Sequence, residues 1–179
     1  MENKTNKIYI LLQDIFKNTW EQQKYAEVKN GVLLTLNVAI FVVIIRVYFN
    51  ISSTINHDNF KIWFYILMLV FICHMICMIQ SFFPKDSNKE KKKWNYDEIN
   101  IFFFGDIQKL ESKEYLEILT KKIDCDSSTI NKSPLLDLSN QIVKLSEITQ
   151  SKYSSFKWSI YRMYFLGFLF IIYFTILFF

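Results

Sequence analysis

The residues that could do chemistry in this chain of 179 residues are few and scattered. Cys73, His74 and Cys77 place two sulfur atoms and an imidazole within about one helical turn, a spacing that can bind a metal ion. No carboxylate accompanies them, and cysteine is common in buried apolar helices, so ordinary packing is the alternative interpretation. We therefore predict no metal site.

Acidic residues offer no catalytic set either. Glu111, Glu114 and Glu117 follow helical spacing, and a solvated helix face accounts for them better than paired acid and base catalysts. The chain has only 3 glycines, and none belongs to a phosphate-binding loop. The sequence therefore predicts a protein that is not an enzyme and needs no cofactor.

Long apolar segments, rather than chemical motifs, dominate the sequence. Hydrophobic residues make up 51% and aromatic residues 18%, with only 3 glycines and 2 prolines. Few helix breakers and clustered apolar residues predict long membrane helices. We expect an all-α membrane protein with three transmembrane helices and a helical cytoplasmic module, whose final helix is continuous with the last crossing. The expected segments are a cytoplasmic amphipathic helix at 1–30, transmembrane helices at 31–49, 60–83 and 158–179, and a cytoplasmic helical insert at 85–156.

Local patterns refine these helices. The first has an apolar stripe with 3/4 spacing and is expected to continue through Gly31 into the first crossing. Within the insert, Ser112 is expected to cap a helix that runs to Ile123. Pro134 fits the first turn of the long final helix. The stripe residues of the first helix are Ile8, Leu11, Leu12, Ile15 and Phe16, and those of the last are Leu135, Leu138, Ile142, Leu145 and Ile148.

Basic residues predict the orientation. Five lysines precede residue 30 and thirteen lie between Lys85 and Lys157, which is 18 of the 21 basic residues. With three crossings these two groups share one side, and the positive-inside rule makes that side the cytoplasm. The basic run Lys85–Lys93 is expected to be a solvated segment attracted to anionic lipid, with part of a phosphate-binding surface as the alternative.

Polar residues within the crossings are candidates for a pore lining. Thr35 and Asn37 lie near the cytoplasmic end of the first crossing, and polar side chains there usually face protein or water rather than lipid. Three crossings cannot enclose an aqueous path alone, but copies related by rotational symmetry can. The alternative is that Asn37 forms a hydrogen bond with a neighbouring helix.

Three short motifs occur in order between about residue 20 and residue 170. The first is Trp20-x5-Ala26-Glu-x-Lys29-Asn-Gly31-x-Leu-Leu-x-Leu-Asn37. The second is Phe103-Phe-Gly-Asp-Ile107 followed by Glu114-Tyr115-Leu116, and the third is Gln141-Ile142 with Lys152-Tyr153. In these motifs the chain resembles the membrane effectors of bacterial Pycsar anti-phage defence and their relatives. It departs from them in carrying Asn30, where many relatives have a small residue, and in the basic stretch after Pro84.

The resemblance implies a multi-pass effector of the bacterial inner membrane that responds to a nucleotide made during infection and disrupts membrane integrity. In the Pycsar type the signal is a cyclic pyrimidine mononucleotide from a partner cyclase. Related systems use other nucleotides, including short oligonucleotides from a nucleotidyltransferase. We therefore expect a nucleotide-gated channel or pore, built as a homo-oligomer with four copies as the working number.

The resemblance also directs attention to residues near the cytoplasmic membrane face as ligand contacts. There lysines can meet a phosphate and an aromatic ring can stack on a base. The alternative for the three aromatic residues is an interfacial belt or the core of the module. The candidate ligand contacts are Trp20, Lys29, Asn30, Phe104, Asp106, Lys152 and Tyr153.

Two other functions fit the same segments. A non-conducting membrane adaptor would recruit a protein partner through the cytoplasmic helices, and the apolar stripe of the last helix serves it equally well. A constitutive, holin-like pore fits the three crossings but leaves the insert without a purpose. Ion flux separates these alternatives, since an adaptor conducts no ions.

Overall fold

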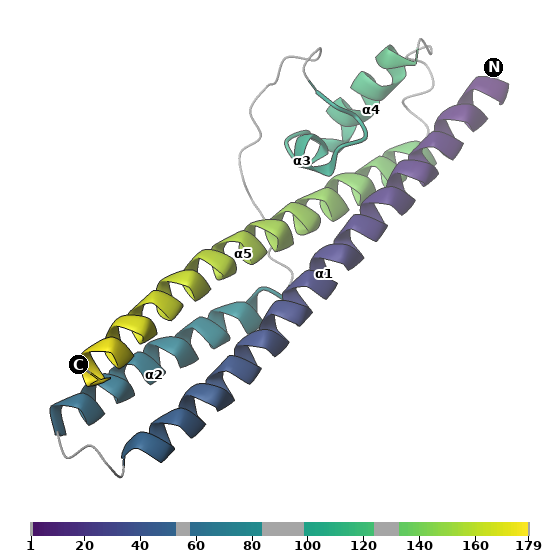
Figure 1. Cartoon of the computed structure of the whole chain (residues 1–179). Coiled ribbons are helices and arrows are strands. Elements are labelled where there is room, and N and C mark those ends of the chain that lie inside the picture. Colours follow the sequence, from purple (N-terminus) through teal and green to yellow (C-terminus); the bar gives the residue numbers. More distant parts are fainter. Residues whose placement is uncertain (1, 53–57, 84–98, 124–132, 179) are drawn as a thin grey trace. The chain divides into compact units, whose positions relative to one another are not determined.

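The computed structural model describes residues 2–52, 58–83, 99–123 and 133–178, and all regular structure within these ranges is helical (Figure 1). Three helices are long: α1 (Glu2–Ser52), α2 (Asp58–Gln80) and α5 (Ser133–Phe178). Two shorter ones, α3 (Phe104–Ile107) and α4 (Ser112–Lys122), lie between α2 and α5 in the chain. The predicted all-α class and the continuous final helix are confirmed. The predicted basic run Lys85–Lys93 lies outside the described residues.

Helix α1 runs through Gly31 without a break, as predicted. No proline occurs in its 51 residues, and a single glycine lowers helix stability by only about 1 kcal/mol relative to alanine. A Cβ atom at Gly31 would meet nothing within 4 Å, so close packing does not require glycine there. Backbone hydrogen bonding along the helix is therefore sufficient to keep α1 continuous.

The ends of α4 correct one prediction. Its N-cap is Glu111, and Ser112 is the first helical residue. Glu111 and Glu114 form a capping box, in which each side chain accepts a hydrogen bond from the other residue's backbone N–H. The carboxylate of Glu111 thus replaces the hydroxyl expected from Ser112, whose Oγ donates to Oδ1 of Asn140 at 3.0 Å instead. These contacts give Glu111 and Glu114 a structural role at the start of α4, and Glu117 is exposed, as expected for a solvated helix face.

The helices are shared between two compact units, each with its own core. The insert unit comprises Met1–Ala26 and Pro84–Tyr153, and the membrane unit comprises Glu27–Phe83 and Ser154–Phe179. Both α1 and α5 continue from one unit into the other, since each is a single helix.

The insert unit has a core of aliphatic residues around one tyrosine. Tyr115 is fully buried, and its hydroxyl donates to the carbonyl oxygen of Ile101 at 3.1 Å. The predicted stripe at the start of α1 is part of this core. The fully or nearly buried members are Ile8, Leu12, Ile15, Ile99, Ile101, Ile107, Leu110, Tyr115, Leu116, Ile118, Leu119, Leu135, Ile142 and Val143.

The membrane unit has an aromatic core between α1, α2 and α5. The rings of Tyr48 and Phe64 stack with centroids 3.6 Å apart and planes 4° apart. By length and composition, three helices among the described residues can cross a membrane. The limits of the crossings stay predictions, because helix ends such as Ser52 and Gln80 do not mark the lipid boundary. The core members are Tyr48, Phe64, Met68, Phe71, Leu166, Phe170 and Tyr173.

We predict that Tyr115→Phe destabilises the insert unit by about 1 kcal/mol, because the buried carbonyl of Ile101 loses its donor. Burial also raises the pKa of Tyr115 above its ordinary value. The folded unit therefore favours the protonated phenol, and this contribution is lost as the pH rises above the unfolded value of about 10. Hydrogen exchange of the α4 amides between pH 7 and pH 11 measures both effects after correction for the intrinsic exchange rate.

The matched control is Tyr25→Phe, since the Tyr25 side chain is 63% exposed on α1. It should leave protection of α4 unchanged. Equal protection and equal pH dependence in the Tyr115→Phe variant and the parent chain would contradict the assigned role of the hydroxyl.

Candidate ligand-binding site

Tyr153 joins three parts of the insert unit. Its hydroxyl donates to Oε1 of Gln22 on α1 at 3.2 Å. Its ring stacks on Phe104, with centroids 5.4 Å apart and planes 15° apart. Tyr153 is also the last residue of the insert unit on α5. One side chain therefore links α1, α3 and α5 at the point where α5 continues into the membrane unit.

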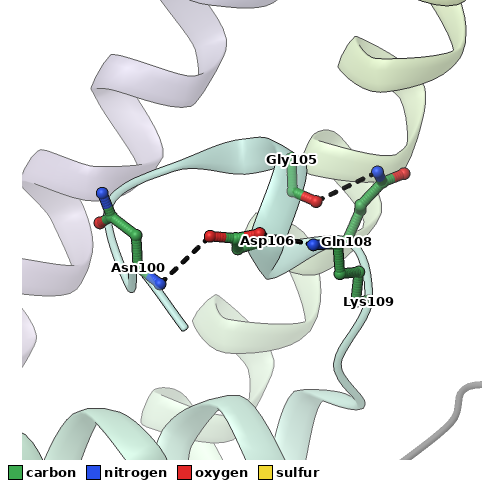
Figure 2. A network of polar contacts seen from close by, with 5 residues as sticks. All are labelled: Asn100, Gly105, Asp106, Gln108 and Lys109. Atoms are coloured by element: carbon green, nitrogen blue, oxygen red, sulfur yellow. Dashed lines mark hydrogen bonds and ion pairs between the residues drawn. The ribbon is translucent and has the colours of Figure 1, made fainter. Parts of the chain in front are cut away.

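The turn that carries Phe104 is held by Asp106 (Figure 2). One carboxylate oxygen accepts the backbone N–H of Asn100 at 3.2 Å, and the other pairs with Nζ of Lys109 at 2.6 Å. In the same turn, Nε2 of Gln108 donates to the carbonyl oxygen of Gly105 at 3.2 Å. Both oxygens of Asp106 thus have protein partners, so its contacts are those of a residue that shapes the turn.

Gly105 allows the two phenylalanines of this turn to pack closely. A Cβ atom at Gly105 would lie 2.4 Å from the ring of Phe103, which is closer than side chains tolerate. The Phe103 ring, 48% exposed, lies against Phe104 with centroids 4.9 Å apart. A side chain at this position would therefore displace the Phe103 ring from its place against Phe104.

Trp20 presents a second aromatic face on α1. It is 44% exposed, stacks on Phe16 with centroids 6.5 Å apart, and has Nζ of Lys24 at 5.6 Å from its ring centroid. The cation–π contact follows from the helical spacing of Trp20 and Lys24. Trp20 and Tyr153 are thus held by different partners within the same unit.

The predicted ligand contacts divide between the two units. Trp20, Phe104, Asp106, Lys152 and Tyr153 belong to the insert unit, whereas Lys29 and Asn30 belong to the membrane unit. Lys152 is only 7% exposed and Asn30 only 3%, while Lys29 is exposed. A ligand role for these seven residues stays a prediction.

The two predicted pore-lining residues lie on different faces of α1. Thr35 is exposed, and its hydroxyl donates to the carbonyl oxygen of Gly31 at 3.0 Å. Asn37 is fully buried, and its Nδ2 donates to the carbonyl oxygen of Leu33 at 2.8 Å and approaches Sδ of Met163 on α5 at 3.7 Å. Asn37 thus makes the contact with a neighbouring helix that was the alternative to pore lining, and pore lining stays a prediction.

The Cys73, His74 and Cys77 side chains do not converge. Both cysteines are exposed, whereas His74 is 4% exposed and turned into the bundle. Among the described residues, no group of three potential ligands lies close enough for a metal ion.

Sequence reasoning missed Gln22 and Asn100. Gln22 lies 131 positions from its partner Tyr153, so no local pattern could have connected them. Asn100 had a local signal, because asparagine before a turn often accepts a backbone N–H two residues later. Its Oδ1 accepts the N–H of Phe102 at 3.0 Å in this way.

The comparison with protein families identifies the chain. The model of the Pycsar effector protein domain matches residues 11–179, and the chain therefore belongs to this family of membrane effectors in anti-phage defence. Members of the family respond to cyclic nucleotide signals from partner cyclases. No curated protein and no solved structure matches the chain.

We predict that Asp106→Ala loosens the turn before α4 by about 1 kcal/mol, because it removes both an ion pair and the acceptor for Asn100. Lys109→Ala removes the ion pair alone and should have a smaller effect. Hydrogen exchange of the amides from Asn100 to Leu110 measures the difference. Equal effects of the two substitutions would show that the Asn100 contact contributes nothing.

Proposed function

We propose that this member of the Pycsar effector family is a nucleotide-gated membrane channel or pore that acts as a homo-oligomer in the inner membrane. In this proposal the insert unit is cytoplasmic and binds a cyclic pyrimidine mononucleotide made by a partner cyclase during infection. Binding opens the membrane unit, and the resulting ion flux stops growth of the infected cell.

The observation that carries the proposal is the position of Tyr153. It contacts Gln22 on α1 and Phe104 in the turn before α4, and both α1 and α5 continue into the membrane unit. A ligand that competes for the face of Phe104 would release Tyr153 and change how α1 and α5 are held together. A local binding event would thereby reach the helices that cross the membrane.

The free energies of the two Tyr153 contacts lie in the range expected for an equilibrium that a ligand can shift. An aromatic pair contributes about 0.5–1.5 kcal/mol beyond its buried area, and a neutral hydrogen bond contributes a similar amount. Together the two contacts of Tyr153 amount to about 1–3 kcal/mol, a coupling that changes an equilibrium about 5- to 150-fold. If the two contacts of Tyr153 were stronger, the ligand could not displace them. If they were weaker, the channel would open without the ligand.

The aromatic residues of the insert unit could also stack on the base of a nucleotide. Stacking of a base on an aromatic ring contributes about 1–3 kcal/mol, which is comparable to the contact that it would replace on Phe104. Lys152 is the cation next to Tyr153 in the sequence, and Lys24 lies over Trp20. A cyclic mononucleotide, with one flat base and one phosphate charge, matches an aromatic surface with few cations.

The number of crossings supports oligomerisation. Three crossings per chain are too few to enclose an aqueous path alone, whereas copies arranged by rotational symmetry can enclose one. Their outward faces carry large apolar side chains such as Val42, Val43 and Trp63, which can contact lipid or another copy. We therefore place the pore between copies related by rotational symmetry.

The proposal predicts that ion flux from liposomes containing the purified full chain rises when a cyclic pyrimidine mononucleotide is added. Cyclic purine mononucleotides and short oligonucleotides serve as the comparison ligands. In Tyr153→Phe the stack remains but the bond to Gln22 is lost. The opening should then need less nucleotide, by about fivefold for a loss of about 1 kcal/mol.

Tyr25→Phe is the matched control, since it removes an exposed hydroxyl from the same unit. Flux without any nucleotide would favour a constitutive pore. No flux from folded, inserted protein with any of these ligands would favour the adaptor. If Tyr153→Phe and the parent chain open at the same nucleotide concentration, the contact of Tyr153 with Gln22 plays no part in gating.

A further inference from the structure

The last helix carries an exposed aromatic face that changes in chemistry along its length. Trp158 is 63% exposed, Tyr161 54%, Phe165 61% and Phe168 60%, and all four belong to the membrane unit. They recur at intervals of three and four positions, so with 3.6 residues per turn they lie on one side of α5. Two amphipathic rings therefore begin this face, and two apolar rings continue it towards the C-terminal end of the helix.

Lys157 reaches along the helix towards the two amphipathic rings. Its side chain is exposed, and Nζ lies 6.0 Å from the centroid of the Tyr161 ring. Trp158 meets the same ring edge-on, with centroids 6.1 Å apart and planes 69° apart. The ammonium group of Lys157 therefore lies at the level of the Trp158–Tyr161 pair.

Arg162 reaches the same level from the opposite direction. Its Nε donates to the carbonyl oxygen of Trp158 and its Nη2 to Oγ of Ser159, each at 3.3 Å. Both partners precede Arg162 in the helix, so the guanidinium folds back towards the N-terminal end of α5. At about 100° per residue, Lys157 and Arg162 lie on opposite flanks of the face that Trp158 and Tyr161 share.

The helix supplies no negative charge to balance these two cations. No aspartate or glutamate follows Glu147 in the sequence, and Glu147 itself pairs with Lys144 in the insert unit at 3.5 Å. Within the residues that the structure describes, neither Lys157 nor Arg162 forms an ion pair. Cations at the edge of an apolar segment are stabilised by an anion, and anionic headgroups supply one at the membrane surface.

The order of side chains along this face matches one leaflet of a bilayer. Cations favour the level of the phosphates, and tryptophan and tyrosine favour the membrane–water interface. At about 1.5 Å per residue, Phe168 lies about 15 Å beyond Trp158, which is about half the thickness of the hydrocarbon core. A second copy docked symmetrically on this face would bring four cations together, and a nucleotide has no acyl chain to cover the phenylalanines.

We propose that Lys157, Trp158, Tyr161 and Arg162 bind the headgroup of an anionic phospholipid, one acyl chain of which lies along Phe165 and Phe168. The site goes beyond the proposed nucleotide response and does not rest on it, since it is formed by one helix of the membrane unit. A lipid bound there fixes the depth at which α5 enters the bilayer.

Native mass spectrometry of the full chain in a neutral detergent tests the site. The protein is titrated with phosphatidylglycerol and, separately, with phosphatidylcholine that has the same acyl chains. We expect the parent chain to bind phosphatidylglycerol more tightly. The double variant Lys157→Gln with Arg162→Gln should lose this preference, with affinity for phosphatidylglycerol falling about fivefold for each cation removed. Arg162→Lys, which keeps the charge, should retain it.

Arg46→Gln is the matched control, because it removes an exposed cation from α1 in the same unit. An equal loss of phosphatidylglycerol binding in this control would overturn the proposal, as would a parent chain that binds both lipids equally. Glycerol phosphate that binds as tightly as the lipid would also overturn it, since the site would then recognise a free phosphate. If the double variant does not fold, Lys157→Gln, which changes an exposed side chain, is compared with Arg46→Gln in the same titrations.

Discussion

The rest of the structure depends on unbroken backbone hydrogen bonding along α1 and α5. Lipid offers no partner for a free N–H or C=O group, so a segment that crosses a membrane must stay helical. In this chain the same helices extend beyond the apolar segments: α1 begins at Glu2 and α5 at Ser133. Each of these two helices therefore contributes residues to both units.

The cores of the two units are built from different types of residue. The insert unit is packed mainly by branched aliphatic residues around Tyr115, and its functional candidates, Phe104 and Tyr153, lie at the edge of that packing. The membrane unit is packed by stacked aromatic rings, and its buried polar residues include Asn37 and His74.

Sequence patterns predicted much of the fold and little of the site. The stripe from Ile8 to Phe16, the passage of α1 through Gly31 and the start of α5 beside Pro134 all follow from helical periodicity and local propensity, which act over a few residues. The N-cap of α4 was misplaced by one residue, because Glu111 can cap as well as Ser112. The Gln22–Tyr153 contact and the burial of Asn37 and His74 depend on packing between helices far apart in the chain, which no local pattern encodes.

The most direct test of the account is to interrupt α1 and α5 between the two units. A flexible Gly-Ser-Gly insertion after Ala26 and another after Tyr153 would separate the insert unit from the membrane unit at their boundary. The same insertions placed between Ser52 and Asp58, outside both helices, are the matched control. If the two helices carry the signal, the interrupted chain still binds the nucleotide but shows no nucleotide-dependent flux in liposomes, while the control responds like the parent chain. An unchanged flux response in the interrupted chain would contradict coupling through these helices.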